Sequence, residues 1–525
     1  MCTVVKVDVI IAVHNAEDTV EETVKSALHQ EIPAHLLLDD SIKKCRGITS
    51  LSDVKFDVAV CCYNDASSDR SLEILHALKK EHENSKSLSS HEGSKLISTT
   101  LLIGTVPEGS SSRGAGYARN QAVKLRDLND DVSTTDGSGS SKNSFHFLCI
   151  LDSDDIMHNT RIAEQTSAML SLGYQDGSKT LCGKHLSENA LMGCQFDRIP
   201  NDSTWHYATW ANSLTDERVV LEKFRECTLL QPTWFLSKSW FDSLGGWLEA
   251  PTTDEEMNKL KNTNSYYRLI HKSEIIEAAG SKVISPTLRL AEDTRLFYAH
   301  IRAGGTLHLH RTATSTPLVL YRHRAGMSQS SSTPRKLLMK LRAKAWEDIV
   351  FFGNRGAGND ETIWSKQGFV IWGAGRDGKD FLKALSPEVA CRVVCFVDVD
   401  YNKIEKIKFY DNPSIGVRIP IVHFSELAKD PGACHTAFGR VSKEKTAAAA
   451  ANSFDRSHTG TRNRCEEPRR KKAKTQSGLA SSLDPSVIRD LPVVVCVAMY
   501  RTNGALESNV ASIGRVEGKD LWHIS

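Results

Sequence analysis

Three carboxylates follow an apolar stretch in residues 147–157, FLCILDSDDIM. Asp152, Asp154 and Asp155 repel one another, so a cation, a helix N-terminus or solvent must compensate them. Aspartate commonly caps a helix, and the residues that follow, IMHNTRIAEQTSAML, have a helical pattern. Carboxylates at positions i and i+2 can instead hold Mg²⁺ or Mn²⁺, which prefer few carboxylates plus substrate phosphates. We predict a divalent metal at Asp152 and Asp154 that bridges to a diphosphate.

The elements that must position these carboxylates form a repeating pattern. Short apolar runs alternate with amphipathic helical stretches, which is typical of βαβ units around a parallel sheet. The predicted strands are 7–13, 56–63, 101–106 and 145–151, and the predicted helices between them are 17–30, SLEILHALKK and 116–126. The carboxyl ends of such strands are where α/β folds bind ligands. Polar segments at 85–98 and 127–144 are predicted to be solvated loops.

A second domain is predicted after residue 330. We assign residues 1–330 to the first α/β domain, 331–365 to a basic linker helix and 366–525 to a smaller Rossmann-like domain. A low-complexity, disordered insertion is expected at about 440–486. Its basic run PRRKKAK (468–474) is a nuclear signal, a phosphate-contacting arm or only a solvated charge run.

The second domain contains a glycine pattern after a predicted strand. Gly373, Gly375 and Gly378 form GxGxxG, and Asp398 follows twenty residues after the last glycine. This spacing fits the dinucleotide-binding fingerprint. The alternative is a tight strand–helix turn that binds no cofactor, and the sequence leaves both open.

Composition excludes several classes of protein. The chain has 525 residues, a formal net charge of +2, 40% hydrophobic and 25% charged residues, which is ordinary for a globular protein of several domains. The near-neutral charge excludes a global basic field, so any nucleic-acid contact must be local. The thirteen cysteines include no CxxC pair, and no apolar stretch reaches membrane-spanning length. With no signal peptide at the N-terminus, we expect a cytoplasmic protein, or a nuclear one if PRRKKAK is a signal.

Five stretches resemble family 2 glycosyltransferases of the GT-A fold, in the order of that family. They span residues 5–328: AVHNAEDTVEETVKSALHQ, YNDASSDRS, RGAGYARNQAV, LDSDD and AEDTRLFYAHIRAGG. The resemblance implies a UDP-sugar donor and a Mn²⁺ or Mg²⁺ cofactor. One departure is Asn64-Asp65, where the family usually has an acidic pair.

The resemblance also implies roles for individual residues. Asp65 would accept a hydrogen bond from the uracil N3–H, and Arg113 and Arg119 would lie near the nucleotide or its phosphates. Other residues would line the nucleotide, the ribose and the metal: Ala12, Val13, His14, Asn15, Glu17, Asp152, Ser153 and Asp154.

Glu292 and Asp293 begin the last of these stretches. Acidic residues are favoured at a helix N-terminus, and this role is compatible with catalysis. By the resemblance, Asp293 is the catalytic base that takes the acceptor proton in an inverting transfer. Glu292 lies beside it and is a candidate on the acceptor side.

A narrower resemblance concerns the acceptor. Residues 231–247 (QPTWFLSKSWFDSLGGW), IWGAGRDGKDF and the final GKDLWHIS resemble animal enzymes that galactosylate queuosine at the tRNA wobble position. This implies UDP-galactose as donor and tRNA as acceptor. Insertions at 34–53, 127–144, 250–285 and 440–486 are peculiar to this chain. The alternatives are β-1,3-N-acetylglucosaminyl transfer to a galactoside, and a non-catalytic tRNA- or protein-binding module.

Two further groups could contact an acceptor. The aromatic residues Trp205, His206, Tyr207, Trp210 and Trp234 could stack on a sugar or base, or form core. In the helix at 335–352, Lys336, Lys340 and Lys344 recur at helical spacing and could contact tRNA phosphates. The alternative is a linker helix with a solvated basic side.

Overall fold

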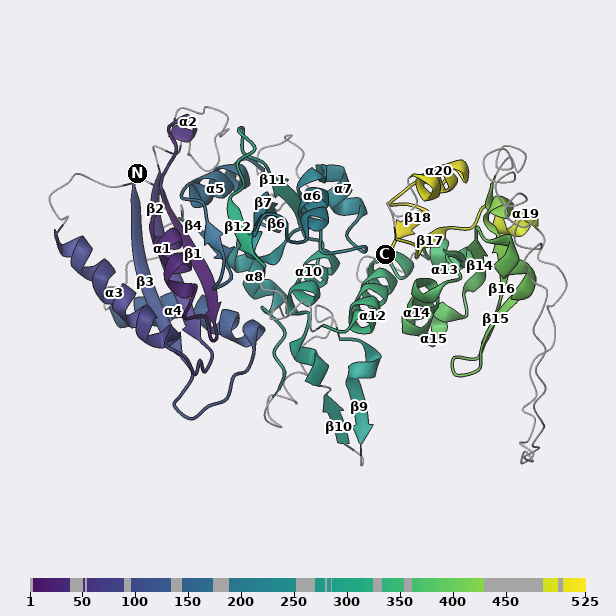
Figure 1. Ribbon diagram of the computed structural model, residues 1–525, viewed down its shortest axis with the longest axis horizontal. Coiled ribbons are helices and arrows are strands. Elements are labelled where there is room, and N and C mark those ends of the chain that lie inside the picture. The colour runs from purple at the N-terminus through teal and green to yellow at the C-terminus, as the bar shows by residue number, and fades with distance from the viewer. Residues whose placement is uncertain are drawn as a thin grey trace, which may run out of the picture. The chain divides into compact units, whose positions relative to one another are not determined.

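The computed structural model divides the chain into two compact units, Met1–Asp360 and Glu361–Ser525, which are described separately (Figure 1). The structure describes residues 3–37, 51, 54–88, 96–133, 144–172, 188–251, 270–278, 281–284, 286–323, 333–353, 361–428, 485–498 and 504–525. The PRRKKAK run and residues 440–484 of the predicted insertion lie outside these ranges.

A seven-stranded sheet in the order β11-β6-β8-β4-β1-β2-β3 forms the centre of the first unit. Its strands are β1 (Thr3–Val13), β2 (Val54–Asn64), β3 (Ile97–Thr105), β4 (Ser144–Ile150), β6 (Ala190–Cys194), β8 (Phe235–Ser237) and β11 (Thr306–His310). β8 runs antiparallel to both of its neighbours, and the other pairs are parallel. The four predicted strands of the first half are therefore present as parallel neighbours.

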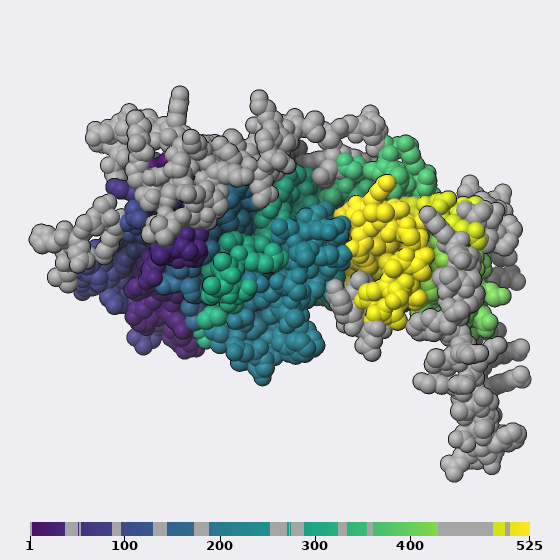
Figure 2. Space-filling view, turned by 90° about the horizontal axis from the view of Figure 1, so that it is seen from above, coloured from purple at the N-terminus to yellow at the C-terminus, as the bar shows by residue number. Residues whose placement is uncertain are grey.

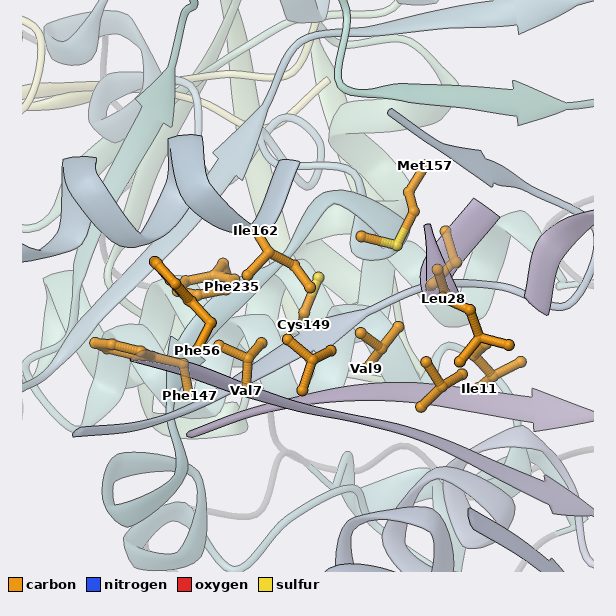
Figure 3. Close-up of a cluster of buried hydrophobic side chains, with 14 of the residues drawn as sticks. Val7, Val9, Ile11, Leu28, Phe56, Phe147, Cys149, Met157, Ile162 and Phe235 are labelled. Atoms are coloured by element: carbon orange, nitrogen blue, oxygen red, sulfur yellow. The ribbon is translucent and has the colours of Figure 1, made fainter. Parts of the chain in front are cut away.

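Alternation along β1 decides which helices cover each face of this sheet. Val7, Val9 and Ile11 point into a core that also contains Phe147 and Ile162 (Figure 3). That core lies under α1 (Val20–Leu28), α3 (Ser71–Leu88) and α5 (Arg161–Leu172). Side chains of a strand alternate between faces, so the even-numbered residues of β1 face the opposite side, which α4 (Ala115–Ser133) covers.

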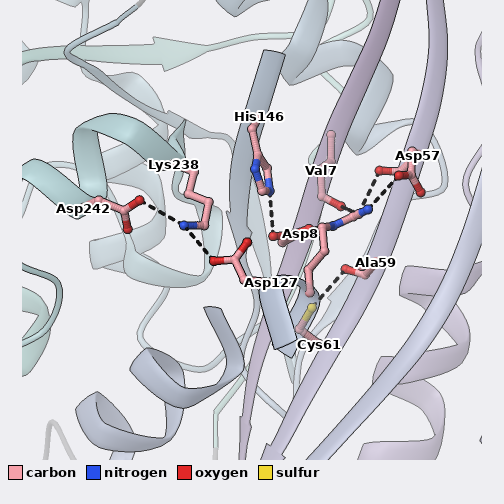
Figure 4. Close-up of polar contacts among 10 residues, drawn as sticks. Val7, Asp8, Asp57, Ala59, Cys61, Asp127, His146, Lys238 and Asp242 are labelled. Carbon is pink, nitrogen blue, oxygen red and sulfur yellow. Dashed lines mark hydrogen bonds and ion pairs between the residues drawn. The ribbon is translucent and has the colours of Figure 1, made fainter. Parts of the chain in front are cut away.

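The α4 face buries a polar cluster in addition to apolar side chains such as Ile10 and Leu148 (Figure 4). The carboxylate of Asp8 is fully buried and accepts from Arg126 Nε at 2.5 Å and from His146 Nε2 at 2.7 Å. Arg126 also donates to the Asp57 carboxylate at 2.7 Å. Removing one partner of such a buried pair costs about 3–5 kcal/mol, so this cluster fixes how α4 sits on the sheet.

The chain that follows the carboxylates of β4 forms a strand. β5 (Ile156–Met157) pairs with β12 (Val319–Arg322), which pairs in turn with β7 (Phe196–Ile199). The prediction of a helix from residue 156 onward is wrong for its first residues, because cross-strand pairing overrides local helical propensity and α5 begins only at Arg161. Figure 2 shows teal-green atoms from beyond residue 290 lying against the purple N-terminal segment.

The remaining elements of the first unit are mostly short. They are α2 (Ala34–Leu37), α6 (Trp205–Ser213), α7 (Asp216–Leu221), α8 (Lys238–Leu244), α10 (Glu292–Arg302), α12 (Arg335–Trp346), the π-helix η6 (Glu347–Phe351), the 3₁₀ turns η2 (Gln231–Thr233), η4 (Lys272–Glu274) and η5 (Pro286–Arg289), and the hairpin of β9 (Ile275–Ala278) and β10 (Ser281–Ile284). Among the described residues, no helix has the length and apolar character needed to cross a bilayer.

The second unit has a six-stranded sheet in the order β15-β16-β14-β13-β17-β18. Its strands are β13 (Phe369–Trp372), β14 (Val393–Asp398), β15 (Phe409–Asn412), β16 (Val417–His423), β17 (Val493–Val495) and β18 (Leu521–His523); its helices are α13 (Ile363–Gln367), α14 (Arg376–Ala384), α15 (Pro387–Ala390), α16 (Tyr401–Lys406), η7 (Phe424–Leu427), α19 (Pro485–Ile488) and α20 (Ala505–Ser512). All its strand pairs are parallel except β15 with β16. The α/β fold class is confirmed: a unit built on a mostly parallel sheet is followed by a smaller unit with a mostly parallel, Rossmann-like sheet.

Candidate active site

The loop Asp152–Asp155 lies at the carboxyl end of β4, and the start of α1 holds its backbone. The hydroxyl groups of Thr19 and Thr23 both donate to the carbonyl oxygen of Ser153 at 3.0 Å. The loop also closes on itself, with Asp155 N donating to the Asp152 carbonyl at 3.1 Å. The three carboxylates are therefore presented by a backbone fixed at several points.

Arg322 holds the other side of this loop. Its backbone N–H donates to the Asp155 carboxylate at 2.8 Å, and its Nε donates to the Asp154 carbonyl at 2.9 Å. Asp155 thus binds a neighbouring strand, while α5 starts only at Arg161. The helix-capping explanation of these aspartates is excluded by this geometry.

One carboxylate of the loop, that of Asp155, is buried with an oxygen that lacks a partner among the described residues. Asp155 is fully buried, and its Oδ2 has no hydrogen-bond partner. Burial, followed by the negative charges of Asp152 and Asp154, raises the pKa of Asp155 well above its usual range. Asp152 and Asp154 themselves are half-buried. A cation between them and solvent would relieve this repulsion.

These residues fit a divalent metal that takes its other ligands from a substrate. Within the described ranges, no group of three or more His, Cys, Asp or Glu side chains is arranged to enclose a metal ion. Mg²⁺ and Mn²⁺ do not need such a cage, because one or two carboxylates plus phosphate oxygens and waters complete their coordination. The predicted ligands Asp152 and Asp154 remain the proposed pair.

Arg119 joins the carboxylate loop to the beginning of α10. Its guanidinium donates to Asp152 at 2.6 Å and to Glu292 at 2.9 Å, and the residue is 5% exposed. Two charge-assisted hydrogen bonds to a buried arginine fix both partners. The structure therefore brings together two predicted acidic groups that lie far apart in the sequence. That Arg119 lies near a nucleotide or its phosphates stays a prediction.

Asp293 lies next to Glu292 in the first turn of α10 and is half-buried. Its Oδ1 accepts from the backbone N–H of Thr294 at 2.6 Å and from the Thr294 hydroxyl at 3.2 Å. Burial, together with the negative charge of Glu292, raises the pKa of Asp293 to about 6. A pKa near the working pH suits a general base, because such a group is ionised yet accepts a proton readily.

Asp65 follows β2 and is 2% exposed. Its Oδ2 accepts from the Ser112 hydroxyl and the Gly114 N–H, both at 2.7 Å, while Arg113 N–H lies 3.0 Å from both carboxylate oxygens. The carboxylate therefore holds the loop that leads into α4. Oδ1 receives only the shared bond from Arg113 among the described residues, so it retains a lone pair for a ligand donor.

The loops after β1 and β2 clamp each other through reciprocal hydrogen bonds. Asn15, in a left-handed conformation with φ of 49°, accepts from Ser68 N at 2.8 Å through its side chain. Glu17 N donates to Asp69 at 3.0 Å, and Arg70 N donates back to the Glu17 carboxylate at 3.1 Å. The predicted nucleotide residues Asn15 and Glu17 thus also build the loop that carries them.

The other residues predicted to lie along a nucleotide have different exposures. His14 is exposed, and its Nδ1 lies 2.7 Å from the carbonyl oxygen of Asp65. Ala12 is half-buried, and the Val13 side chain is fully buried in the core under α1. Val13 can therefore face a ligand only through its backbone.

Arg113 lies at the same edge of the sheet as Asp65. Its guanidinium stacks over the ring of Tyr117 at 4.1 Å and forms an ion pair with Glu249 at 3.5 Å. Stacking and pairing order this side chain beside the Asp65 carboxylate.

The prediction that Trp234 contacts an acceptor is wrong. Trp234 is 1% exposed, its Nε1 donates to the Leu229 carbonyl at 2.9 Å, and its ring stacks near Phe297. It belongs to the core because every face of its ring is covered. Of the other aromatic candidates, Trp205 is 53% exposed.

The basic helix α12 belongs to the first unit and packs near α10. The Lys344 ammonium pairs with Asp348 at 2.5 Å, and Lys340 donates to the Ser273 hydroxyl at 2.7 Å. Lys336 is exposed. Two of the three lysines thus have partners within the protein. That these lysines contact tRNA stays a prediction.

The glycine loop of the second unit packs tightly against the helix that follows it. A Cβ at Gly378 would lie 2.0 Å from the Gly373 carbonyl oxygen, so the helix approaches the strand closely. The Asp398 carboxylate pairs with Lys403 at 2.5 Å and accepts from the Ala374 N–H at 3.1 Å. These contacts favour the packing explanation of the GxGxxG pattern over a dinucleotide site.

Sequence reasoning missed two arginines at the carboxylate loop. Arg322 holds the loop backbone, and Arg198 lies on β7 of the same small sheet as Arg322. Arg322 ends β12 and Arg198 lies within β7, and no spacing connects either residue with the aspartates. Only the strand pairing of β5, β12 and β7 reveals that they belong to this region.

No family model matches the chain. Among solved structures, residues 1–349 of S. aureus TarS in complex with UDP-GlcNAc are similar over 74% of this chain and 84% of TarS 1–349, with 12% identity and a TM-score of 0.37. The mannosyltransferase PcManGT of Pyrobaculum calidifontis, in complex with GDP-Man and Mn²⁺, is similar over 66% of this chain and 64% of its own, with 9% identity and a TM-score of 0.31. At these scores the likeness assigns neither an activity nor a ligand to this chain.

Proposed function

We propose that this protein is a metal-dependent, inverting glycosyltransferase that uses a UDP-sugar. One observation carries the proposal: Arg119 joins the carboxylate loop at Asp152 to the pair Glu292 and Asp293. A metal-ligating loop and a base with a pKa near 6 are thereby held at one edge of the sheet. Transfer of a sugar from a diphosphate needs these two groups, one for the leaving diphosphate and one for the acceptor proton.

In this reaction Asp293 acts on the acceptor, and Asp152 and Asp154 act on the leaving diphosphate. The acceptor hydroxyl oxygen forms the new bond to the sugar C1 as the bond between C1 and the diphosphate oxygen breaks on the opposite face. Asp293 takes the hydroxyl proton, and UDP leaves with the bonding electron pair. Asp152 and Asp154 would hold Mn²⁺ or Mg²⁺, which supplies charge stabilisation for the leaving diphosphate.

The donor side of the proposal rests on the edge formed by β1, β2 and β4. Asp65 keeps a lone pair on Oδ1 that suits the N3–H of uracil. Arg113, ordered on Tyr117, lies beside it. His14, Asn15 and the backbone of the β1 loop complete this side. Uracil recognition by a buried carboxylate favours UDP over nucleotides that lack an N–H at this position.

For the substrates, we propose galactose transfer from UDP-galactose to queuosine in tRNA. The support is the resemblance of residues 231–247 and the C-terminal stretch to enzymes of that activity. The test incubates the protein and Mn²⁺ with queuosine-containing tRNA and UDP-galactose, UDP-glucose or UDP-N-acetylglucosamine in parallel. Mass spectrometry of the digested nucleosides should show hexosylated queuosine only with UDP-galactose.

Controls separate a wrong substrate from a wrong activity. Hydrolysis of a UDP-sugar without modification of tRNA would retain the glycosyltransferase but reject this acceptor. Modification from UDP-N-acetylglucosamine alone would reject galactose as the donor sugar. The absence of UDP binding in the presence of Mn²⁺ would contradict the proposed function as a whole.

A further inference from the structure

Arg198 is a buried guanidinium that has no hydrogen-bond or ion-pair partner within the described part of the chain. The residue is 8% exposed, and its Nε is a buried donor without any acceptor. Other buried arginines of the first unit have partners: Arg295 pairs with Glu274, and Arg161 donates to Gln165. An uncompensated buried charge is strongly unfavourable, so Arg198 needs an explanation that these other arginines do not need.

Three aromatic rings hold Arg198 in place. Its guanidinium carbon lies 4.2 Å from the ring centre of Tyr321, 5.6 Å from that of Tyr207 and 5.7 Å from that of Phe196. Contacts of this kind attract the cation through the faces of the rings. They do not accept the five N–H donors of a guanidinium in conventional hydrogen bonds. The rings therefore orient the group without satisfying its N–H donors.

The sheet places Arg198 in line with the carboxylate loop. Arg198 of β7 is the register partner of Tyr321 in β12. β12 pairs with β5 so that Leu320 lies opposite Ile156, and continuing this antiparallel register by one residue brings Tyr321 beside Asp155. Arg198 is thus two strands away from Asp155, which agrees with the influence of its charge on that carboxyl group.

The two groups are of opposite charge, and they do not neutralise each other directly. Asp155 Oδ2 and Arg198 Nε are both buried atoms without a hydrogen-bond partner, and no ion pair joins the two residues. A ligand that carries both a cation and an anion would complement this arrangement, with the cation toward the aspartates and the anion toward the arginine. A metal-bound phosphate is such a ligand, and the planar fork of arginine matches phosphate oxygens.

We propose that Arg198 binds a phosphate group of a substrate, a role that deepens the proposed function and rests on it. The phosphate belongs either to the donor diphosphate or to the backbone of a nucleic-acid acceptor. Both sources present the same anionic oxygens, and binding experiments can distinguish them.

The experiment compares Arg198→Gln with the unmodified protein by calorimetric titration. The titrants are UDP and uridine, each with Mn²⁺, and inorganic pyrophosphate with EDTA. If the donor supplies the phosphate, the Kd of UDP and of pyrophosphate should rise by roughly tenfold or more, as expected for hydrogen bonds to a charged group. The Kd of uridine should not change, because uridine lacks a phosphate.

A matched control is available in the same region. Arg225 also stacks on an aromatic ring, with Trp210 at 5.0 Å, but it forms an ion pair with Glu222 at 2.8 Å. Arg225→Gln should leave all three affinities unchanged. Arg198→Lys keeps the charge without the fork, so it should recover part of the lost affinity. Thermal unfolding of each variant shows whether the fold is intact, and Arg198→Lys decides the matter if Arg198→Gln does not fold.

Further outcomes decide the remaining cases. If the affinities for UDP and pyrophosphate stay unchanged while the KM for RNA acceptor rises tenfold, the acceptor supplies the phosphate. Unchanged affinities together with an unchanged KM would overturn the proposal. An equal loss for uridine and UDP would also overturn it, because the role would then be structural. If the unmodified protein binds pyrophosphate but not UDP, the proposed function fails, and Arg198→Gln still tests the phosphate site.

Discussion

The two sheets of this protein both carry acidic residues at their carboxyl edges, and the surroundings of those residues differ. In the first unit, Asp155 is buried with an unpartnered oxygen, and its pKa is raised by burial and by its neighbours. In the second unit, Asp398 pairs with Lys403 and caps the N–H of Ala374. The Asp155 carboxylate thus keeps an oxygen without a partner among the described residues, whereas the Asp398 carboxylate has partners in its own unit.

Whether an aspartate has a partner distinguishes a binding site from a structural turn better than the sequence motifs do. DSDD is a short motif that could have been a helix cap, whereas GxGxxG with a distant aspartate has the spacing of a nucleotide fingerprint. The shorter motif contains a buried carboxylate oxygen without a partner, whereas the aspartate of the longer one is paired with a lysine. A motif therefore gains its meaning from whether the fold leaves its polar groups without partners.

The largest effect is expected for Asp154→Asn in the first unit. The variant removes one proposed metal ligand, so turnover should fall by about 10³-fold or more, because a metal supplies several kcal/mol of charge stabilisation. Metal-dependent UDP binding, measured by calorimetry, should be lost. Circular dichroism should show an unchanged fold. Undiminished activity in excess EDTA would contradict the proposed role of a metal.

The next largest effect is expected for Asp293→Asn. An amide has nearly the shape of the carboxylate but cannot take a proton, so turnover should fall by about 10²–10⁴-fold. The affinity for UDP should change little, because Asp293 acts on the acceptor. Steady-state kinetics and UDP titration of the same preparation check both statements. Full turnover in this variant would move the base elsewhere, with Glu292 as the first alternative.

The pH profile should report the raised pKa of Asp293. Its carboxylate is the active form, and burial beside Glu292 places its pKa at about 6. Below that pH, kcat/KM should fall by about tenfold per pH unit, and above it the rate should reach a plateau. The acid limb should disappear in Asp293→Asn. A flat profile of the unmodified protein between about pH 5 and about pH 7 would contradict this assignment.

The smallest effects are expected in the glycine loop of the second unit, where stability changes and chemistry does not. Gly378→Ala would force a methyl group against the Gly373 carbonyl and should destabilise the unit by about 1–3 kcal/mol. Gly375→Ala meets nothing within 4 Å and should change stability by at most about 1 kcal/mol. Thermal unfolding measures both.

Ligand addition completes this comparison. NAD, NADP and ATP should not raise the unfolding temperature of the second unit, because Asp398, the residue that would bind a ribose in such a site, is already paired with Lys403. A ligand-induced stabilisation that Gly375→Ala abolishes would show that the second edge is also a binding site.

The sequence predicted β1, β2, β3 and β4 because their apolar runs are long and bounded by polar turns. It did not predict β6, β8 and β11, which complete the first sheet. It predicted the acidic groups at the edge for the same reason, since Asp152 and Asp154 directly follow a strand. It could not predict that Ile156 begins a strand, because the partner of that strand lies at Val319–Arg322. Trp234 was misplaced because the burial of an aromatic side chain depends on elements far away in the chain. Arg198 carried no signal, since nothing in its spacing relates it to the aspartates.

The contact between Arg322 and Asp155 spans 167 positions of the chain. During synthesis the carboxylate loop leaves the ribosome before β12 is made. The hydrogen bonds from Arg322 to the loop can therefore form only later. Contacts of such long sequence separation form late, because the chain between them must first be ordered. A truncated chain that ends before β12 would thus contain every aspartate of the loop and still lack its final geometry. The order of folding, as well as the list of residues, determines when this protein acquires a site.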